Sequence, residues 1–200
     1  MSKAISRVLA KRRAFEDYHK ESNAGIGITL TLILLALHDE FSWQKVKISH
    51  LKDEVDSITL PIEALTDEQK RTTYWQYHDD LIKHGMSERL FRDYVTATPR
   101  AVGAKGKREA GKVMEAAELA YIYFLAGVRR RWKYGKTKLL TIQERMKQDV
   151  YEIKLGHVPL VEFMKVVSLE CGEHFSGLDR YEQIYGVIDP YGPYETKDVK

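Results

Sequence analysis

The sequence predicts an all-α protein, and three observations support this fold class. Only five prolines occur in 200 residues, and the common residues alanine, leucine, lysine and glutamate favour helix. Apolar residues recur at helical spacing along most of the chain. Glycine, proline and capping residues separate these stretches at intervals typical of helix ends. We therefore expect short breaks between helices and no sheet.

The expected helices follow one another from the N-terminus. Ser42 and Ser87 are expected N-caps, and Thr66 with Gln69 forms a capping-box pattern. Pro61 is expected to follow a helix, and Gly85 to end one. By these signals we expect helices over about 4–20, 28–40, 43–57, 66–84, 87–97, 112–131, 136–155, 160–173 and 178–185.

The longest apolar run extends from Ile26 to Leu37. A membrane-spanning helix needs about 20 apolar residues, so this run predicts a buried helix and no membrane contact. The basic N-terminus is not followed by the apolar region of a signal peptide. Cys171, the one cysteine, cannot form an internal disulfide, which favours a reducing compartment. We expect a cytoplasmic protein.

Positive charge is concentrated in one block of the chain. Residues 98–149 carry thirteen basic and five acidic groups, a net +8, whereas 1–38 carry +3 and 39–97 and 150–200 carry −4 each. Such a block is typical of a polyanion-binding surface. An acidic face elsewhere in the molecule, or an acidic protein partner, would explain it equally well.

The composition also predicts how the chain is divided. Residues 98–111 contain Pro99, three glycines and several basic groups, so we expect a basic, mobile linker there. The expected divisions are a first helical half over 1–97, the linker over 98–111, a second helical half over 112–185 and a disordered tail over 186–200.

An offset of 91 residues aligns two stretches without a gap. The shared unit, over about 28–58 and 119–149, is a buried helix, an aromatic-x-aromatic-x-Lys corner and an amphipathic helix. Large rings contribute much buried area, so Phe41 and Trp132 are expected to be buried between helices. The aligned pairs include Phe41 with Trp132, Trp43 with Tyr134, Lys45 with Lys136, Lys47 with Lys138, Ile48 with Leu139, Leu51 with Ile142 and Val55 with Met146.

One copy of this unit carries a resemblance. The segment LLALHDEFSWQKVKISHLKDEV, residues 34–55, resembles a helix–corner–helix segment of small helical proteins encoded by bacteriophages of Gram-positive bacteria. The corner in those proteins reads Phe-Gly-Phe-Gly-Lys, whereas here Ser42 and Gln44 replace both glycines. The resemblance implies a viral, phage-encoded origin and no particular activity.

A metal-dependent enzyme is the third interpretation of the sequence. His38-Asp39 resembles the dipeptide of HD-type phosphohydrolases, in which further His and Asp side chains hold a divalent metal. The remaining candidate positions are His19, His78, Asp79, Asp80 and His84. The second copy of the unit lacks the His-Asp pair, which favours a packing role for the corner. No Walker-type, GxGxxG or GxSxG motif occurs, so we predict no catalytic residue, metal or cofactor.

The segment AGVRRRWKYGKTK, residues 126–138, carries the strongest functional signal. Its three arginines cover several directions of a helix and could simply complement the negative end of the helix dipole. Alternatively, they join nearby lysines in binding phosphates. The predicted nucleic-acid-binding residues are Arg129, Arg130, Arg131, Lys133, Tyr134, Lys136, Lys138, Lys105, Lys107 and Arg108.

The sequence thus predicts an intracellular, phage-encoded regulator that binds nucleic acid through its second half. The alternative is a protein-binding inhibitor or adaptor acting on a host enzyme or defence system, for which the acidic stretches 39–97 and 150–200 could mimic a polyanion. A homodimer in which the two units pair between protomers is also compatible with the repeat.

Overall fold

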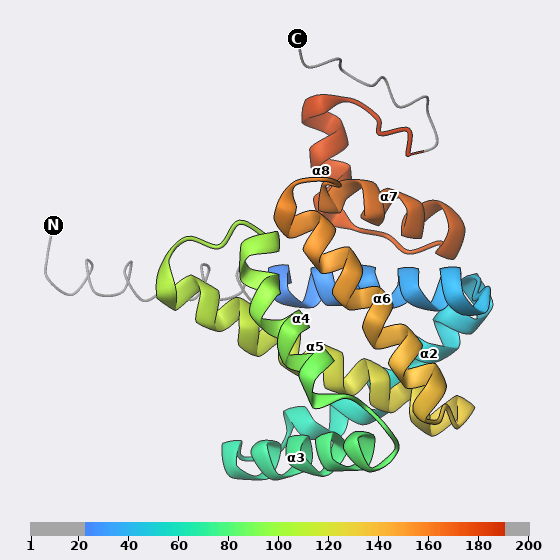
Figure 1. Ribbon diagram of the computed structural model, residues 1–200, viewed down its shortest axis with the longest axis vertical. Coiled ribbons are helices and arrows are strands. Elements are labelled where there is room, and N and C mark those ends of the chain that lie inside the picture. The colour runs from blue at the N-terminus through green and yellow to red at the C-terminus, as the bar shows by residue number, and fades with distance from the viewer. Residues whose placement is uncertain (1–22, 191–200) are drawn as a thin grey trace, which may run out of the picture.

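The computed structural model describes residues 23–190, and every regular element in that part of the chain is a helix. The predicted all-α fold class is confirmed. The expected helix over 4–20 and most of the expected tail lie outside the described residues. The described helices are Asn23–Phe41, α2 (Lys45–Glu63), α3 (Asp67–Lys83), α4 (Glu88–Ala101), α5 (Gly106–Trp132), α6 (Lys136–Leu155), α7 (Leu160–Cys171) and α8 (Ser176–Tyr185) (Figure 1).

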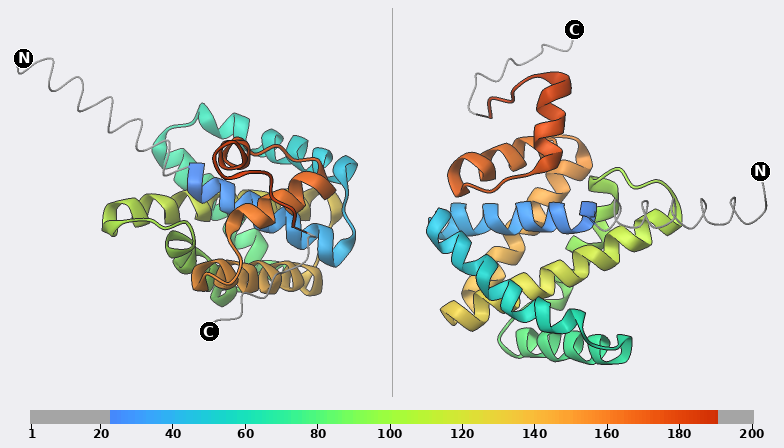
Figure 2. Two further views of the ribbon diagram at one scale, coloured as in Figure 1. Left: turned by 90° about the horizontal axis from the view of Figure 1, so that it is seen from above. Right: turned by 180° about the vertical axis from the view of Figure 1, so that it is seen from behind.

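The helices cross one another rather than forming a parallel bundle. The Asn23–Phe41 helix, α5 and α6 occupy the middle of the molecule, with α6 running across the Asn23–Phe41 helix (Figures 1 and 2). At one end of the long axis lies α3, and at the other lie α7 and α8 (Figure 1). Closely packed pairs include α4 with α5 and α6, and α5 with α2 and α3.

The apolar run predicted to be a core helix is buried. Ile28, Leu34 and Leu37 each show 0% exposure. By length and composition, Asn23–Phe41 is the one described helix apolar enough to cross a membrane, and 56% of its most apolar stretch is buried inside the fold. A buried core helix passes the same test of length and composition, so this feature alone does not define a span.

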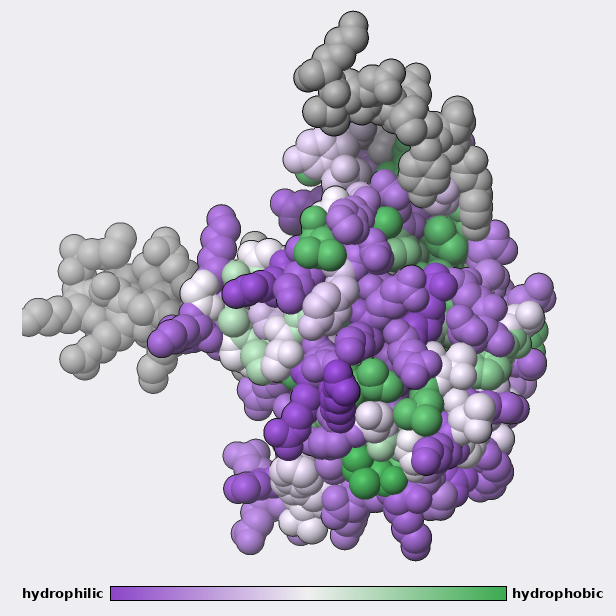
Figure 3. All heavy atoms as spheres, in the orientation of Figure 1, coloured by the Kyte–Doolittle hydropathy of each residue, from purple (hydrophilic) through white to green (hydrophobic). Residues whose placement is uncertain are grey.

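One hydrophobic core joins both halves of the chain. It extends from Ile28 to Leu178 and includes residues of the Asn23–Phe41 helix and of α2 to α8. The face in Figure 3 is mainly hydrophilic, with hydrophobic residues in small separate groups. The two halves therefore share their buried surface.

The expected linker over 98–111 is mostly helical, and this prediction of its extent is wrong. Helix α4 continues to Ala101 and α5 begins at Gly106, leaving 102–105 as the connection. Pro99 is tolerated near the end of α4, where its carbonyl accepts the N–H of Ala104 at 2.8 Å. The Glu109 carboxylate accepts the backbone N–H of Lys105 at 2.6 Å, which stabilises the first turn of α5.

Two of the three predicted caps are confirmed. Thr66 and Gln69 form the capping box at the start of α3, and the Ser87 hydroxyl accepts the N–H of Leu90 at 3.4 Å. Ser42 is not an N-cap: α2 begins after Gln44, which makes no side-chain cap. The expectation failed because the residue adopts a left-handed backbone, which the sequence pattern did not indicate.

Candidate nucleic-acid interface

Two corners of the fold have the same backbone course. One helix ends at Phe41 and the next begins at Lys45; α5 ends at Trp132 and α6 begins at Lys136. Ser42 has a φ of 53° and Lys133, 91 positions later, a φ of 55°. They are the only non-glycine residues with positive φ in the described part of the chain. Each corner therefore turns through one residue in the left-handed region.

The two corners contact each other through their aromatic rings. Trp43 donates its indole N–H to the Tyr134 hydroxyl at 3.1 Å. Phe41 packs against Tyr134 with ring centroids 5.2 Å apart, and Trp43 packs against Trp132 at 4.4 Å. Phe41 and Trp132, expected to be buried, are only half-buried, whereas Trp43 and Tyr134 show 1% and 7% exposure. The second aromatic of each corner, not the first, thus forms the buried contact.

Ion pairs flank the aromatic cluster on both sides. Asp39 accepts from Arg145 at 2.8 Å, and Glu54 pairs with Arg130 at 2.9 Å. The offset of 91 places Arg130 at the position of Asp39 and Arg145 at the position of Glu54. The same two positions therefore pair in both places, with the charges exchanged.

Lysines surround the corners at equivalent positions. The ammonium of Lys47 lies 6.0 Å from the Trp43 ring, and that of Lys138 lies 4.5 Å from the Tyr134 ring. Arg131 lies over the Trp132 ring at 5.5 Å. These contacts hold cations from both corners around one aromatic cluster.

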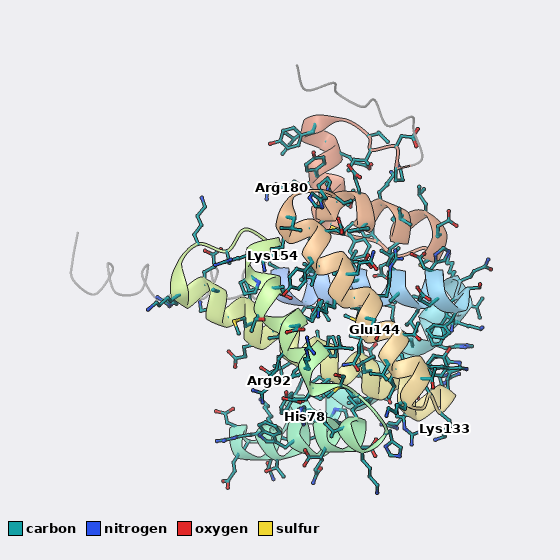
Figure 4. The ribbon with its side chains drawn as sticks, in the orientation of Figure 1. His78, Arg92, Lys133, Glu144, Lys154 and Arg180 are labelled. Carbon is teal, nitrogen blue, oxygen red and sulfur yellow. The ribbon has the colours of Figure 1, made fainter. Side chains whose placement is uncertain are left out.

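We define the corner patch as the exposed cations Lys45, Lys47, Arg131, Lys133, Lys136 and Lys138. Within residues 23–190, no ion pair involves any of them. Lys133 lies at the junction of α5 and α6 (Figure 4). The exposed acid Glu40 holds the position equivalent to Arg131, so the patch is more positive at the second corner.

The starts of α2 and α6 add to the positive character of this surface. Neither helix has a side-chain cap, and neither has an acidic residue in its first turn. Lysines occupy both first turns, where the helix dipole disfavours cations by a few tenths of a kcal/mol to about 1 kcal/mol. Unpaired backbone N–H groups at helix starts attract anions, including phosphate. The arrangement opposes helix stability but favours an anionic ligand.

The three predicted arginines have different environments. All three lie in the last turn of α5, where the helix dipole favours cations. This is the position expected if the arginines complement the negative end of the helix dipole. Arg129 is half-buried, and its Nε has no hydrogen-bond partner in the described part of the chain. Arg130 is paired with Glu54. Arg131 is the one of the three that joins the corner patch.

The predicted residues near the start of α5 do not join this surface. Lys105, Lys107 and Arg108 are exposed, but they lie at the opposite end of a 27-residue helix from Arg131. At 1.5 Å per residue, Arg108 and Arg131 are separated by about 35 Å. The basic block of the sequence is therefore two separate surfaces.

Tyr134 supports the patch from beneath. Because it is buried and its hydroxyl accepts from Trp43, it does not offer the exposed ring that base stacking requires.

Sequence reasoning missed Lys45 and Lys47 as site residues, because they lie outside the basic block. The aligned lysines of the two corners were the signal that could have identified them.

The His38-Asp39 pair lies beside the patch in an ionic network. His38 Nδ1 is 2.9 Å from Asp39, whose other oxygen accepts from Arg145. Arg145 also donates to the buried Asp149 at 3.0 Å. Burial raises the pKa of Asp149 to about 6, although Arg145 opposes the change. Both carboxylate oxygens of Asp39 therefore have a partner, one His38 and the other Arg145.

The other candidate metal ligands are dispersed. No group of three or more His, Cys, Asp or Glu side chains suited to a metal occurs within residues 23–190. His84 pairs with Asp80 at 3.2 Å, and His78 with Glu88 at 2.9 Å. His19 lies outside the described residues. Cys171 is buried, and burial followed by nearby acids raises its pKa to about 11.

No protein-family model, curated protein or solved structure matches this chain. What the fold and the site define, within the described residues, is an all-helical protein in which two helix–corner–helix segments meet at their corners beside a patch of exposed cations.

Proposed function

We propose that this protein is a phage-encoded regulator that binds nucleic acid through the corner patch. The observation that carries the proposal is the convergence of exposed cations from two corners, 91 residues apart, around one aromatic cluster. Cations that have no acidic partner in the described part of the chain are available to neutralise phosphates.

The geometry favours contacts with the backbone over reading of base sequence. Phosphate contacts come from Lys and Arg side chains and from helix starts, and both are present at the patch. Base readout in a groove generally needs a protruding helix or ribbon. The corner patch instead lies at the starts of α2 and α6, which are packed into the fold through Ile48 and Leu139.

The test compares matched pairs of substitutions in a binding titration at several salt concentrations. On duplex DNA, each lost phosphate contact lowers the slope of log affinity against log salt by about 0.9. Replacing Lys136 and Lys138 by alanine should therefore lower the slope by about two units. Replacing Lys45 and Lys47 should have a similar effect. Both pairs are exposed, so the fold should be retained.

The control replaces Lys107 and Arg108 by alanine. This double substitution removes the same amount of charge from the distant end of α5. This double variant should keep the slope of the wild type. Equal losses from both surfaces would indicate a general charge effect and count against a defined patch. Absence of binding to duplex DNA and to RNA at low salt would exclude the proposal.

A second candidate function, a protein-binding adaptor or inhibitor, has its own support. An apolar groove follows α5 between α2 and α3, with two adjoining cavities of about 370 and 600 Å³. Leu119 and Tyr123 line both, and Ile26 is 43% exposed at one end. The lining carboxylates outnumber the lining cations, which are Lys70, Arg71 and Lys112. The carboxylates are Asp56, Glu63, Asp67, Glu115 and Glu118.

The occupant that fits this groove is an amphipathic helix with basic flanks, because its apolar stripe would cover Leu119 and its cations would meet the carboxylates. A synthetic Leu/Lys amphipathic peptide should bind the wild type and lose affinity for Leu119→Asp. The corner-patch variants should bind the peptide normally. Binding that survives Leu119→Asp would exclude the groove.

A further inference from the structure

A further cavity, which shares Tyr74 and Glu118 with the groove, lies between α3, α4 and α5. Its volume is about 300 Å³. Its lining includes the rings of Tyr74, Trp75, His78 and Phe91 and the carboxylates of Glu88 and Glu118. His78 on α3 and Arg92 on α4 lie on the same side of the molecule (Figure 4). The lining thus combines four aromatic or imidazole rings with two carboxylates.

The rings of the lining meet at different angles, and Tyr74 and His78 are stacked at 29° with centroids 6.1 Å apart. Trp75 is inclined by 77° to Tyr74, with centroids 5.2 Å apart, and by 77° to His78, with centroids 5.1 Å apart. Phe91 meets His78 from α4 at 5.9 Å. Tyr74, His78 and Phe91 are buried, whereas Trp75 is 47% exposed. The π faces of aromatic rings attract cations, so a lining with several rings favours a positively charged ligand.

The carboxylates are fixed in this cavity by donors from its walls. Glu88 accepts from His78 at 2.9 Å and from Arg92 at 2.7 Å. Burial raises the pKa of Glu88, but hydrogen bonds from Arg92 and His78 lower it on balance, so Glu88 is ionised at neutral pH. Glu118 accepts from the Tyr74 hydroxyl at 2.5 Å. Burial, then Glu118, raises the pKa of Tyr74 well above its usual range, so the phenol remains a donor.

The charge of the cavity is negative. Glu88 and Glu118 contribute two negative charges and Arg92 one positive charge, with Asp79 also beside His78 at 3.4 Å. The Arg92 side chain is 75% exposed, so its guanidinium lies at the mouth and leaves the interior open. A neutral apolar ligand would not use the carboxylates, and an anion would be repelled by them.

We propose that this cavity binds an organic cation, an alkylammonium or guanidinium group, between Trp75, Tyr74 and the Glu118 carboxylate. The ring faces attract the positive charge, and the carboxylate neutralises it in a partly desolvated site. The group can belong to a free amine or to a basic side chain of a peptide, since both present the same chemistry. This site is independent of the proposed nucleic-acid binding.

The test uses tetramethylammonium as the probe and 3,3-dimethylbutanol as its neutral, similarly shaped control. Chemical-shift changes of the Trp75 indole N–H are followed by NMR in titrations of the full chain. Saturable binding of the cation, with binding of the alcohol weaker by about tenfold, is the expected result. A trimethyllysine peptide is the third probe. Tighter binding by the peptide indicates a protein source for the cation, and equal binding indicates a small molecule.

Two variants make the test decisive. Glu118→Gln should weaken tetramethylammonium binding by about tenfold. Arg92→Gln should strengthen it, because it removes the competing cation at the mouth while leaving an exposed surface position. Because stronger binding requires a folded protein, misfolding of the variant cannot produce this result. Equal binding of cation and alcohol, weaker binding by Arg92→Gln, or no saturable change at Trp75 would each overturn the proposal.

Discussion

Trp43 and Tyr134 hold the same position in their respective corners, 91 residues apart, and are joined by a hydrogen bond of 3.1 Å. The offset also exchanges the neighbouring ring contacts, because Phe41 with Tyr134 becomes Trp132 with Trp43. Those two contacts have interplanar angles of 54° and 53°. Pairs in which i contacts j and j contacts i are the pattern that two-fold symmetry produces. Superposition of the complete units, 28–58 and 119–149, stays a prediction.

The first testable prediction concerns this hydrogen bond. Tyr134→Phe removes the acceptor and leaves the buried Trp43 N–H without a partner, which costs about 1–3 kcal/mol. The free energy of unfolding, from urea denaturation, should fall by that amount. Tyr185→Phe is the control, since Tyr185 is 71% exposed and should change stability by less than about 0.5 kcal/mol. Equal stability of the two variants would contradict a structural role for the bond.

The second prediction concerns the exchanged ion pairs. Glu54→Arg places two arginines together and should destabilise the fold by about 0.5–1 kcal/mol, a small effect because Arg130 is 50% exposed. Adding Arg130→Asp recreates the Asp39–Arg145 arrangement at the other corner. The double variant should recover most of the lost stability in thermal unfolding. If the double variant is less stable than Glu54→Arg alone, the two pairs are not equivalent.

Local signals predicted some helix ends and missed others: Pro61, expected to follow a helix, lies inside α2, which continues to Glu63. Helix α6 begins and ends at the expected residues, and the capping box at Thr66 marks the start of α3. In α2, Val46 is 69% exposed, whereas Ile48 and Leu51 on the same helix are buried. The burial of single residues near a helix start depends on the approach of other helices, which the sequence pattern does not specify.

The candidate site was predicted only in part, because the missing information was spatial. Charge counting identified Arg131, Lys133, Lys136 and Lys138, but it could not show that α5 separates Arg108 from them. It also could not show that the acidic first half contributes lysines to the patch. The cavity around His78 gave no signal, because its walls come from three helices.

The third prediction tests the left-handed residue of the first corner. At a φ of 53°, Ser42 is strained by its Cβ. Ser42→Gly should stabilise the protein by up to about 1 kcal/mol. Gln44 has a φ of −122°, so Gln44→Gly relieves no backbone strain. This substitution should lower stability, because glycine increases the conformational entropy of the unfolded chain. Melting temperatures that move in the same direction for both variants would contradict this account.

The fourth prediction is a pH dependence due to Asp149. Its pKa is raised from 3.8 to about 6 by burial, with Arg145 opposing and Asp39 and Glu152 adding to the increase. The folded state therefore holds a proton that the unfolded state has released, so stability falls as pH rises between 3.8 and about 6. The loss is on the order of 2–3 kcal/mol.

The variant Asp149→Asn should lack this loss. Its stability relative to the wild type should therefore increase between pH 4 and pH 7, and the comparison cancels the other titrating groups. The measurement is the free energy of unfolding at several pH values for both proteins. A constant difference between them over this range would show that burial does not raise the pKa of Asp149.

The last prediction concerns Gly85, which follows α3 and contacts the second corner. With a φ of 103°, the residue is in a conformation that favours glycine, and an added Cβ would lie 2.4 Å from the Cβ of Lys136. Gly85→Ala should therefore combine backbone strain of about 1 kcal/mol with a steric clash. Gly103, with a φ of 70° and no atom within 4 Å of the added Cβ, is the matched control. Gly103→Ala should lower stability through the backbone strain alone.

Because Lys136 belongs to the corner patch, Gly85→Ala should also weaken nucleic-acid binding, and Gly103→Ala should not. Equal destabilisation by the two substitutions in urea unfolding would show that Gly85 is not closely packed against Lys136.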